Sequence, residues 1–254
     1  MEHEEYCARA GAEIMRLAAI TEGAAPQTPV PTCPGWDLAQ LVKHTGVVHR
    51  WATATVVTRA TDRLDSTTLD VGLPESPAGY PTWLAAGSAP LLAALREAGP
   101  DAPVWSWAAS TGSRWWARRM LHETAVHRAD AELSLGIEPD FSPAAAADGV
   151  DELLTNALVG GRPSRRLGEL PAGETIHLHA TDDGLGSEGG EWLITFGGDG
   201  YAWSHGHAKG SVAVRGPAGR LLLLVYGRVR PDDEHLQVFG DPGLLAAWQD
   251  VMSL

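Results

Sequence analysis

The sequence predicts an α+β protein in two parts: a helical bundle over residues 1–140 and a small α+β domain over residues 141–254. Two observations predict this division. The first 140 residues carry apolar positions at helical spacing. From Thr175 onward, short runs instead alternate apolar and polar residues between glycines. The segment from Ile137 to Pro143 holds two prolines and marks the expected boundary.

Composition restricts the class of partner. The 254 residues are 44% hydrophobic and 20% charged, which is typical of a globular protein, and the formal net charge is −13. An acidic surface repels nucleic acid and anionic lipid, so we expect neither as a partner. The start of the chain lacks the basic and apolar pattern of a secretion signal, and the longest strongly apolar run, Leu221 to Val225, is too short to cross a bilayer. A cytoplasmic protein is expected, with its oligomeric state left open.

Helical periodicity predicts the elements of the first part. The best specified helix start is at Asp37, which can cap the helix while Gln40 reaches back to it. The segment from Pro26 to Pro34 is an irregular connector, and a proline-rich loop is expected over residues 61–81. The predicted helices cover residues 4–20, 38–57, 84–98 (beginning at Ser88 if Pro90 lies in the first turn) and 115–135.

The second part should mix strands and helices. A helix is expected over residues 144–159, and glycines 197, 198 and 200 with Asp199 should form a hairpin turn. A further helix is predicted over residues 217–226, and Asp241 should cap a last helix that runs through Trp248. Strands are predicted over residues 175–181, 191–196, 201–204, 211–214 and 236–239.

The chemistry of the first part centres on Glu123 and His127. They lie four residues apart on one helix, so they share a face with Trp116 and Met120. A carboxylate and an imidazole on an otherwise apolar face need a partner, and a divalent metal ion would satisfy both. The alternative is a simple hydrogen-bonded pair, because such spacing is expected about once by chance in this composition. The segment from His122 to His127 is one residue longer than an HExxH motif, which disfavours a metalloprotease.

A third ligand could come from the preceding helix. His44 and His49 lie on opposite flanks of the core side of that helix, so periodicity alone does not choose between them. Lys43 and Arg50 mark the side expected to face solvent.

Other side-chain groups compete for a function. Four tryptophans crowd the start of the helix at 115–135, where they could pack the core or wall a pocket leading to the Glu/His pair. These are Trp105, Trp107, Trp115 and Trp116. His177 and His179 share one face of a strand, a metal-binding geometry, but the apolar alternate residues should leave both rings to solvent or to an interface. His205 and His207 lie in a glycine-rich turn region. Cys7 and Cys33 agree with a reducing compartment and are expected to be idle thiols.

Three features together resemble the mycothiol-dependent maleylpyruvate isomerase family of actinobacteria: the start PGWDLAQLVKH, the segment HETAVHRAD and the appended α+β domain. The resemblance implies a DinB-like four-helix bundle followed by an SCP2-like domain. It also implies that His44, eight residues after Trp36, joins Glu123 and His127 as a metal ligand, and that Arg228 reaches the substrate.

The resemblance further implies what the protein does. The expected cofactors are a divalent metal, first of all Zn²⁺ with Ni²⁺ or Fe²⁺ as alternatives, and mycothiol as the thiol co-substrate. Trp105 and Trp116 are the candidate cofactor-binding residues, and Asp130 could orient a ligand. The predicted activity is isomerisation of, or thiol transfer to, a small carboxylated electrophile. The alternatives are a binding protein without chemistry and a purely structural bundle.

Overall fold

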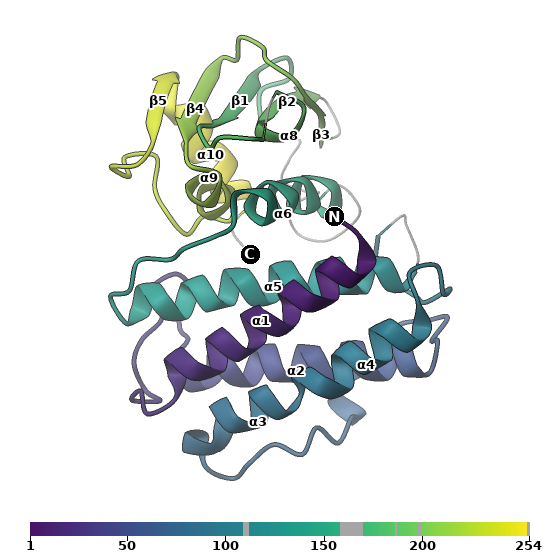
Figure 1. Ribbon diagram of the computed structural model, residues 1–254. Helices are drawn as coiled ribbons and strands as arrows, with labels where there is room; N and C mark the ends of the chain where they lie inside the picture. Colours follow the sequence, from purple (N-terminus) through teal and green to yellow (C-terminus); the bar gives the residue numbers. More distant parts are fainter. Residues whose placement is uncertain (109–111, 158–169, 186, 198–199, 253–254) are drawn as a thin grey trace. The chain divides into compact units, whose positions relative to one another are not determined.

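The computed structural model describes residues 1–108, 112–157, 170–185, 187–197 and 200–252. The chain divides into two compact units, Met1–Pro139 and Asp140–Leu254 (Figure 1). The first unit is helical and the second combines a sheet with helices, so the predicted fold class is confirmed.

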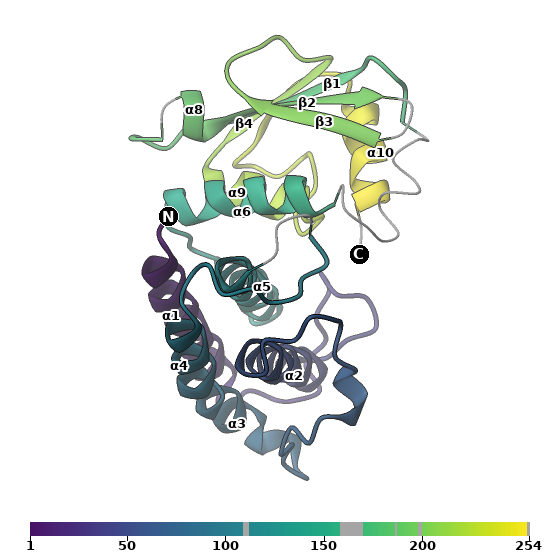
Figure 2. The same ribbon diagram turned by 90° about the vertical axis from the view of Figure 1, so that its right-hand side faces the viewer.

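The first unit is a bundle of four long helices and one short one. α1 lies against α5, and α2 lies against α4 and α5. Figure 2 looks nearly along α2 and α5, and the helices of this unit surround a common apolar core. Their bounds are α1 His3–Thr21, α2 Leu38–Val57, α3 Tyr80–Ala86, α4 Ser88–Ala98 and α5 Ser113–Ser134. Two short 3-10 turns, η1 Ser66–Thr68 and η2 Pro77–Gly79, lie in the segment between α2 and α3.

The start of α2 forms as predicted. The Gln40 backbone amide donates to the Asp37 side chain at 2.8 Å, and the Asp37 amide donates to the Gln40 side chain at 2.9 Å. This reciprocal cap satisfies two amides that the first turn of a helix leaves without partners. The position of each later residue around the α2 axis follows from this start.

Of the two starts predicted for the helix that ends at Ala98, Ser88 is confirmed and Leu84 is wrong, because α4 begins at Ser88 and Leu84 belongs to a separate helix, α3, which ends before Gly87. A side chain at Gly87 would lie 2.7 Å from the Arg50 guanidinium, so a glycine permits this close approach. Arg50 itself was expected to face solvent. It is instead half-buried, stacks 3.8 Å over the Trp83 ring and donates to the Trp83 carbonyl.

The second unit contains a five-stranded sheet of order β3-β2-β1-β4-β5. β1 and β4 are parallel, and the other neighbours are antiparallel. The strands are β1 Thr175–Ala180, β2 Glu191–Gly197, β3 Gly200–His205, β4 Val212–Gly216 and β5 Gln237–Gly240. The helices are α6 Pro143–Asn156, α8 Ser187–Gly190, α9 Ala218–Val225 and α10 Pro242–Met252.

One face of this sheet is covered by helices. Figure 2 shows α6, α9 and α10 on the same side of the strands. Ile176 and Leu178 of β1 are buried on that side, as their alternation predicts. The short helix α8 was not predicted. The last residues of the helix expected at 144–159, and residues 198–199 of the expected turn, lie outside the described residues.

Within the described part of the chain, none of the helices is long and apolar enough to cross a membrane.

Candidate metal centre

His44, Glu123 and His127 meet in the first unit. The Nε2 atom of His44 lies 3.1 Å from Oε1 of Glu123, and the Nε2 atom of His127 lies 3.5 Å from the same oxygen. One ligand atom from each of the three residues lies within 4.8 Å of the other two. α2 supplies His44 and α5 supplies the other two, so the packing of these helices creates the group.

His49, the other histidine of α2, lies apart from this group. It is fully buried, and its Nε2 atom lies 2.8 Å from the Thr124 hydroxyl. Because that hydroxyl donates its own hydrogen to the Met120 carbonyl, His49 must donate from Nε2. Burial lowers the pKa of His49 to about 3, so its ring is neutral. The geometry therefore places His44, and not His49, beside Glu123.

Neighbouring side chains fix which atoms of the group face inward. The Arg119 guanidinium donates to Oε2 of Glu123 at 3.0 Å, which leaves Oε1 toward the two histidines. Asp130, fully buried, accepts from Nδ1 of His127 at 2.9 Å, which directs Nε2 of that ring toward Glu123. Cys33 donates from its thiol to the same Asp130 oxygen at 3.3 Å. A carboxylate behind a histidine in this way is the usual support of a metal-bound imidazole.

The pKa values of Glu123 and His127 are both strongly shifted from their ordinary values. Burial pushes the pKa of Glu123 upward, but hydrogen bonds from His127 and His44 and the charge of Arg119 outweigh it and hold that pKa well below its ordinary value. Burial lowers the pKa of His127, but Asp130, Cys33 and Glu123 outweigh it and raise that pKa well above its ordinary value. Glu123 is thus a carboxylate, and a metal ion would replace the proton on Nε2 of His127.

Trp36 is the aromatic ring that covers the group. Its centroid lies 4.9 Å from that of His44 and 6.0 Å from that of His127, nearly parallel to the latter. The side chains of His44, Glu123 and His127 are 37%, 20% and 11% exposed, so the group opens toward solvent on the His44 side. In the sequence, Trp36 serves only as a landmark for His44, and its position just before the helix cap at Asp37 is the one signal for a role at this group.

The tryptophans at the start of α5 pack against one another. Trp116 is fully buried, donates from its indole nitrogen to the Trp105 carbonyl at 2.7 Å and lies edge-on to Trp51. Trp105 is half-buried and contacts the Trp51 and Trp107 rings. These contacts favour the core-packing alternative for Trp116. A cofactor contact by Trp105 or Trp116 stays a prediction.

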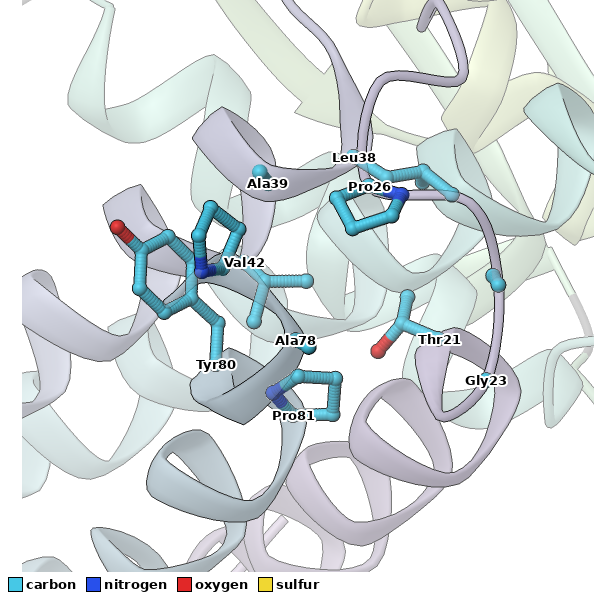
Figure 3. A pocket seen from close by; sticks show the side chains of 11 residues that line it. Thr21, Gly23, Pro26, Leu38, Ala39, Val42, Ala78, Tyr80 and Pro81 are labelled. Atoms are coloured by element: carbon cyan, nitrogen blue, oxygen red, sulfur yellow. The ribbon is translucent and has the colours of Figure 1, made fainter. Parts of the chain in front are cut away.

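A cavity of about 240 Å³ lies elsewhere in the first unit. Figure 3 shows Val42, Tyr80 and Pro81 among its lining side chains. Its walls are mostly apolar, and none of the three candidate ligands lines it. The cavity therefore adds no chemistry to the His44, Glu123 and His127 group.

Arg228, the predicted substrate-binding residue, lies in the second unit just after α9. Its guanidinium donates to the Tyr226 carbonyl at 2.8 Å and lies 5.8 Å from the centroid of the Tyr226 ring. A role in substrate binding stays a prediction.

The expectation that both rings of the His177 and His179 pair face solvent or an interface is wrong for His177. His177 is buried, and its Nε2 atom lies 3.1 Å from the Glu191 carboxylate. The alternation of apolar and polar residues correctly predicts the two faces of β1. The face that carries the histidines is also covered, by the loop that contains Gly210.

The residues of the first group fit a divalent metal ion. Two imidazole nitrogens and one carboxylate oxygen face one another, each held by a neighbour or a ring, and one side is open. This is the ligand set of catalytic zinc sites, which keep a position for water or substrate. Fold and site together define a two-part protein: a helical bundle with a candidate metal centre, followed by an α+β domain.

Comparisons with known proteins identify the family. The model of the mycothiol maleylpyruvate isomerase N-terminal domain matches residues 7–132, and that of the MDMPI C-terminal domain matches residues 144–247. The chain therefore belongs to the mycothiol maleylpyruvate isomerase family, as its sequence resemblance implied.

Two solved structures share the fold. A histidine-to-alanine mutant of the mycothiol-dependent maleylpyruvate isomerase is similar with a TM-score of 0.60, and another structure of mycothiol-dependent maleylpyruvate isomerase with 0.53. Each is 13% identical, and each match covers 94% of this chain and 93% of the other. No curated protein matches the sequence.

Proposed function

We propose that this protein is a metal-dependent enzyme that uses mycothiol to isomerise, or to add a thiol to, a small electrophile that carries a carboxylate. The observation that carries the proposal is the meeting of His44 and His127 on one oxygen of Glu123. Membership of a family named for a mycothiol-dependent isomerase supports the choice of thiol and reaction.

The three residues would hold the ion, most readily Zn²⁺, through two neutral imidazoles and a carboxylate. When bound, such an ion lowers the pKa of a thiol that reaches its open position, so that a thiolate is present at neutral pH. Asp130 holds Nδ1 of His127, Arg119 holds the outer oxygen of Glu123, and the Trp36 ring packs beside both imidazoles. The exposed flank at His44 is where the thiol would enter.

Isomerisation and thiol addition begin with the same step. The thiolate adds to an activated carbon–carbon double bond, forming a C–S bond and moving the electron pair toward the activating carbonyl. Rotation about the resulting single bond followed by loss of the thiolate gives the trans isomer. Protonation of the carbon instead leaves the S-conjugate. Arg228 would bind the substrate carboxylate through paired hydrogen bonds, a geometry that suits a guanidinium.

Metal content and turnover test this proposal together. We expect tag-free wild-type protein to bind Zn²⁺ at this centre and to convert maleylpyruvate, or a member of a panel of electrophiles, with mycothiol. His44→Ala should lose both the ion and turnover, whereas His235→Ala, which changes an exposed histidine in the second unit, should keep both.

Two results would contradict the proposal. Unchanged metal occupancy in His44→Ala would remove His44 from the centre. A wild-type protein that binds metal and is stabilised by mycothiol, but turns over none of the electrophiles, would be a binding protein instead.

A further inference from the structure

The second unit holds another group of histidines around a carboxylate. Oε2 of Glu191 lies 3.1 Å from Nε2 of His177, 2.7 Å from Nδ1 of His207 and 3.5 Å from Nδ1 of His179. One ligand atom each of His177, Glu191 and His207 lies within 4.8 Å of the other two. The three imidazole rings stand at steep angles to one another, between 72° and 87°.

The sheet register brings two elements of this group together. His177 and His179 are two residues apart on β1 and share the face opposite Ile176 and Leu178. Glu191 is the first residue of β2 and pairs directly with His179 across the antiparallel ladder. Residues directly opposite in such a pair project from the same face, so the carboxylate lies between strands β1 and β2 beside both rings.

The segment after β3 adds His207. Gly206 has a φ of +126°, which favours glycine, and its amide donates to the Glu191 carbonyl at 3.2 Å. The turn at Gly206 carries His207 back over the end of β2. Gly210 then passes so close to β1 that a side chain there would lie 2.9 Å from the His177 amide nitrogen. This loop explains why His177 is buried although it lies on the face without helices.

His205 does not join the group. Its Nε2 atom lies 3.3 Å from Asp151 of α6, and it pairs across the ladder with Trp192, whose indole donates to the same aspartate. His205 therefore belongs to the helix-covered side. Of the two histidines in this region of the sequence, only His207 contacts the Glu191 carboxylate among the described contacts, whereas Nδ1 of His205 lies 3.1 Å from the Glu191 backbone carbonyl.

The distances between the Glu191 oxygen and the imidazole nitrogens are compatible with ligands around one metal ion. Two atoms bound tetrahedrally at about 2.1 Å from a metal lie about 3.4 Å apart. The Glu191 oxygen lies 3.1 Å from the His177 nitrogen and 2.7 Å from the His207 nitrogen, near that value, and all three ligand atoms lie within 4.8 Å of one another. His177 and His207 also hydrogen-bond this Glu191 oxygen directly, so an ordinary hydrogen-bonded network is the alternative that the metal titration must separate from a metal site.

The geometry points to a second divalent-metal site, in the α+β unit, formed by His177, Glu191 and His207. Imidazole and carboxylate ligands suit Zn²⁺ and neighbouring transition metals. Three ligands from the protein leave one position of a tetrahedral ion for water. The ion would fasten the loop at 206–210 to strands β1 and β2, so we expect it to stabilise this unit.

Metal stoichiometry tests this site separately from the bundle centre. Tag-free full-length protein is stripped with a chelator, dialysed and titrated with ZnCl₂ alone, with Tm followed in parallel. We expect His207→Ala to bind one equivalent fewer than wild type, whatever the occupancy of the bundle centre. His207 is 75% exposed, so this variant should fold. His235→Ala, an exposed histidine in the same unit, is the matched control.

His207→Ala and Glu191→Gln should each weaken Zn²⁺ binding at the site in the second unit at least about 100-fold, since even supporting residues around metal sites contribute 10- to 100-fold. Both should reduce the rise in Tm on adding Zn²⁺. Equal stoichiometry and affinity in wild type and His207→Ala would overturn the proposal. If only His44→Ala, and not His207→Ala, bound one equivalent of Zn²⁺ fewer than wild type, the bundle centre would be supported and the second site would be excluded.

Discussion

Nε2 of His44 and Oε1 of Glu123 lie 3.1 Å apart although 79 positions separate the two residues in the sequence. The contact joins α2 to α5, and Nε2 of His127 approaches the same oxygen from one turn further along α5. The bundle thereby holds two imidazoles against a single carboxylate oxygen.

Asp130→Asn should weaken metal binding at the bundle centre about 10- to 100-fold. The substitution keeps the shape but removes the charge that holds Nδ1 of His127. Chelator competition measures the affinity, and thermal unfolding of the metal-free protein reports whether the fold has changed. Asp62→Asn, at an exposed loop carboxylate, is the control. An unchanged affinity would show that Asp130 does not position the ring.

His49→Ala should lower the stability of the protein and leave its metal content unchanged, whereas His44→Ala should lose the metal. His49 is fully buried against Thr124, so its removal leaves a cavity, and we expect a loss of about 2–4 kcal/mol in the free energy of unfolding. Metal content at the bundle centre should remain that of wild type. Denaturant unfolding and metal analysis of the same sample check both points. A loss of metal as large as in His44→Ala would instead return His49 to the ligand set.

Cys7 should make the bundle sensitive to alkali. Burial, with a smaller contribution from Glu4, raises the pKa of this thiol from 9.0 to about 11. Because the folded pKa is above the unfolded one, the stabilisation is fully present below pH 9 and disappears as pH rises toward 11. The two-unit shift corresponds to about 3 kcal/mol at most.

Unfolding free energies of wild type and Cys7→Ala between pH 8 and 11 check this expectation. The decline with pH should be shallower in Cys7→Ala. Alkylation at neutral pH gives a second readout, because the fully buried Cys7 should react more slowly than the half-buried Cys33. Parallel pH curves for the two proteins would contradict the assignment.

Arg228→Ala should raise KM for a carboxylated electrophile about 10-fold or more, because hydrogen bonds to a charged group contribute about 1.5–3 kcal/mol. Metal content should not change. Arg228→Lys should recover only part of the effect, since an ammonium cannot make the paired contact. Arg230→Ala, at a side chain that is 87% exposed nearby, is the control. An unchanged KM in Arg228→Ala would exclude this residue from substrate binding.

Much of the architecture could be predicted because its signals are local. The cap at Asp37 depends on residues within one turn, and it forms as expected. The sequence left Leu84 and Ser88 open as starts of the helix that ends at Ala98, because the break at Gly87 depends on the close approach of Arg50 from α2. The burial of His177 was missed for a similar reason, since the loop through Gly210 that covers it comes from beyond two further strands.

The sequence by itself determined that Glu123 and His127 share a face, because the period of a helix fixes the direction of residues four apart. It also determined the family, through the combination of motifs that carries the resemblance. Periodicity left His44 and His49 open, and the resemblance implied His44, which lies beside Glu123 in the tertiary structure. The tertiary structure alone shows Trp36 beside both rings and His207 joined to Glu191 and His177. Periodicity gives the direction of a side chain around its own helix or strand. Which partner that side chain meets depends on how two elements distant in sequence pack together, and only the folded chain decides that.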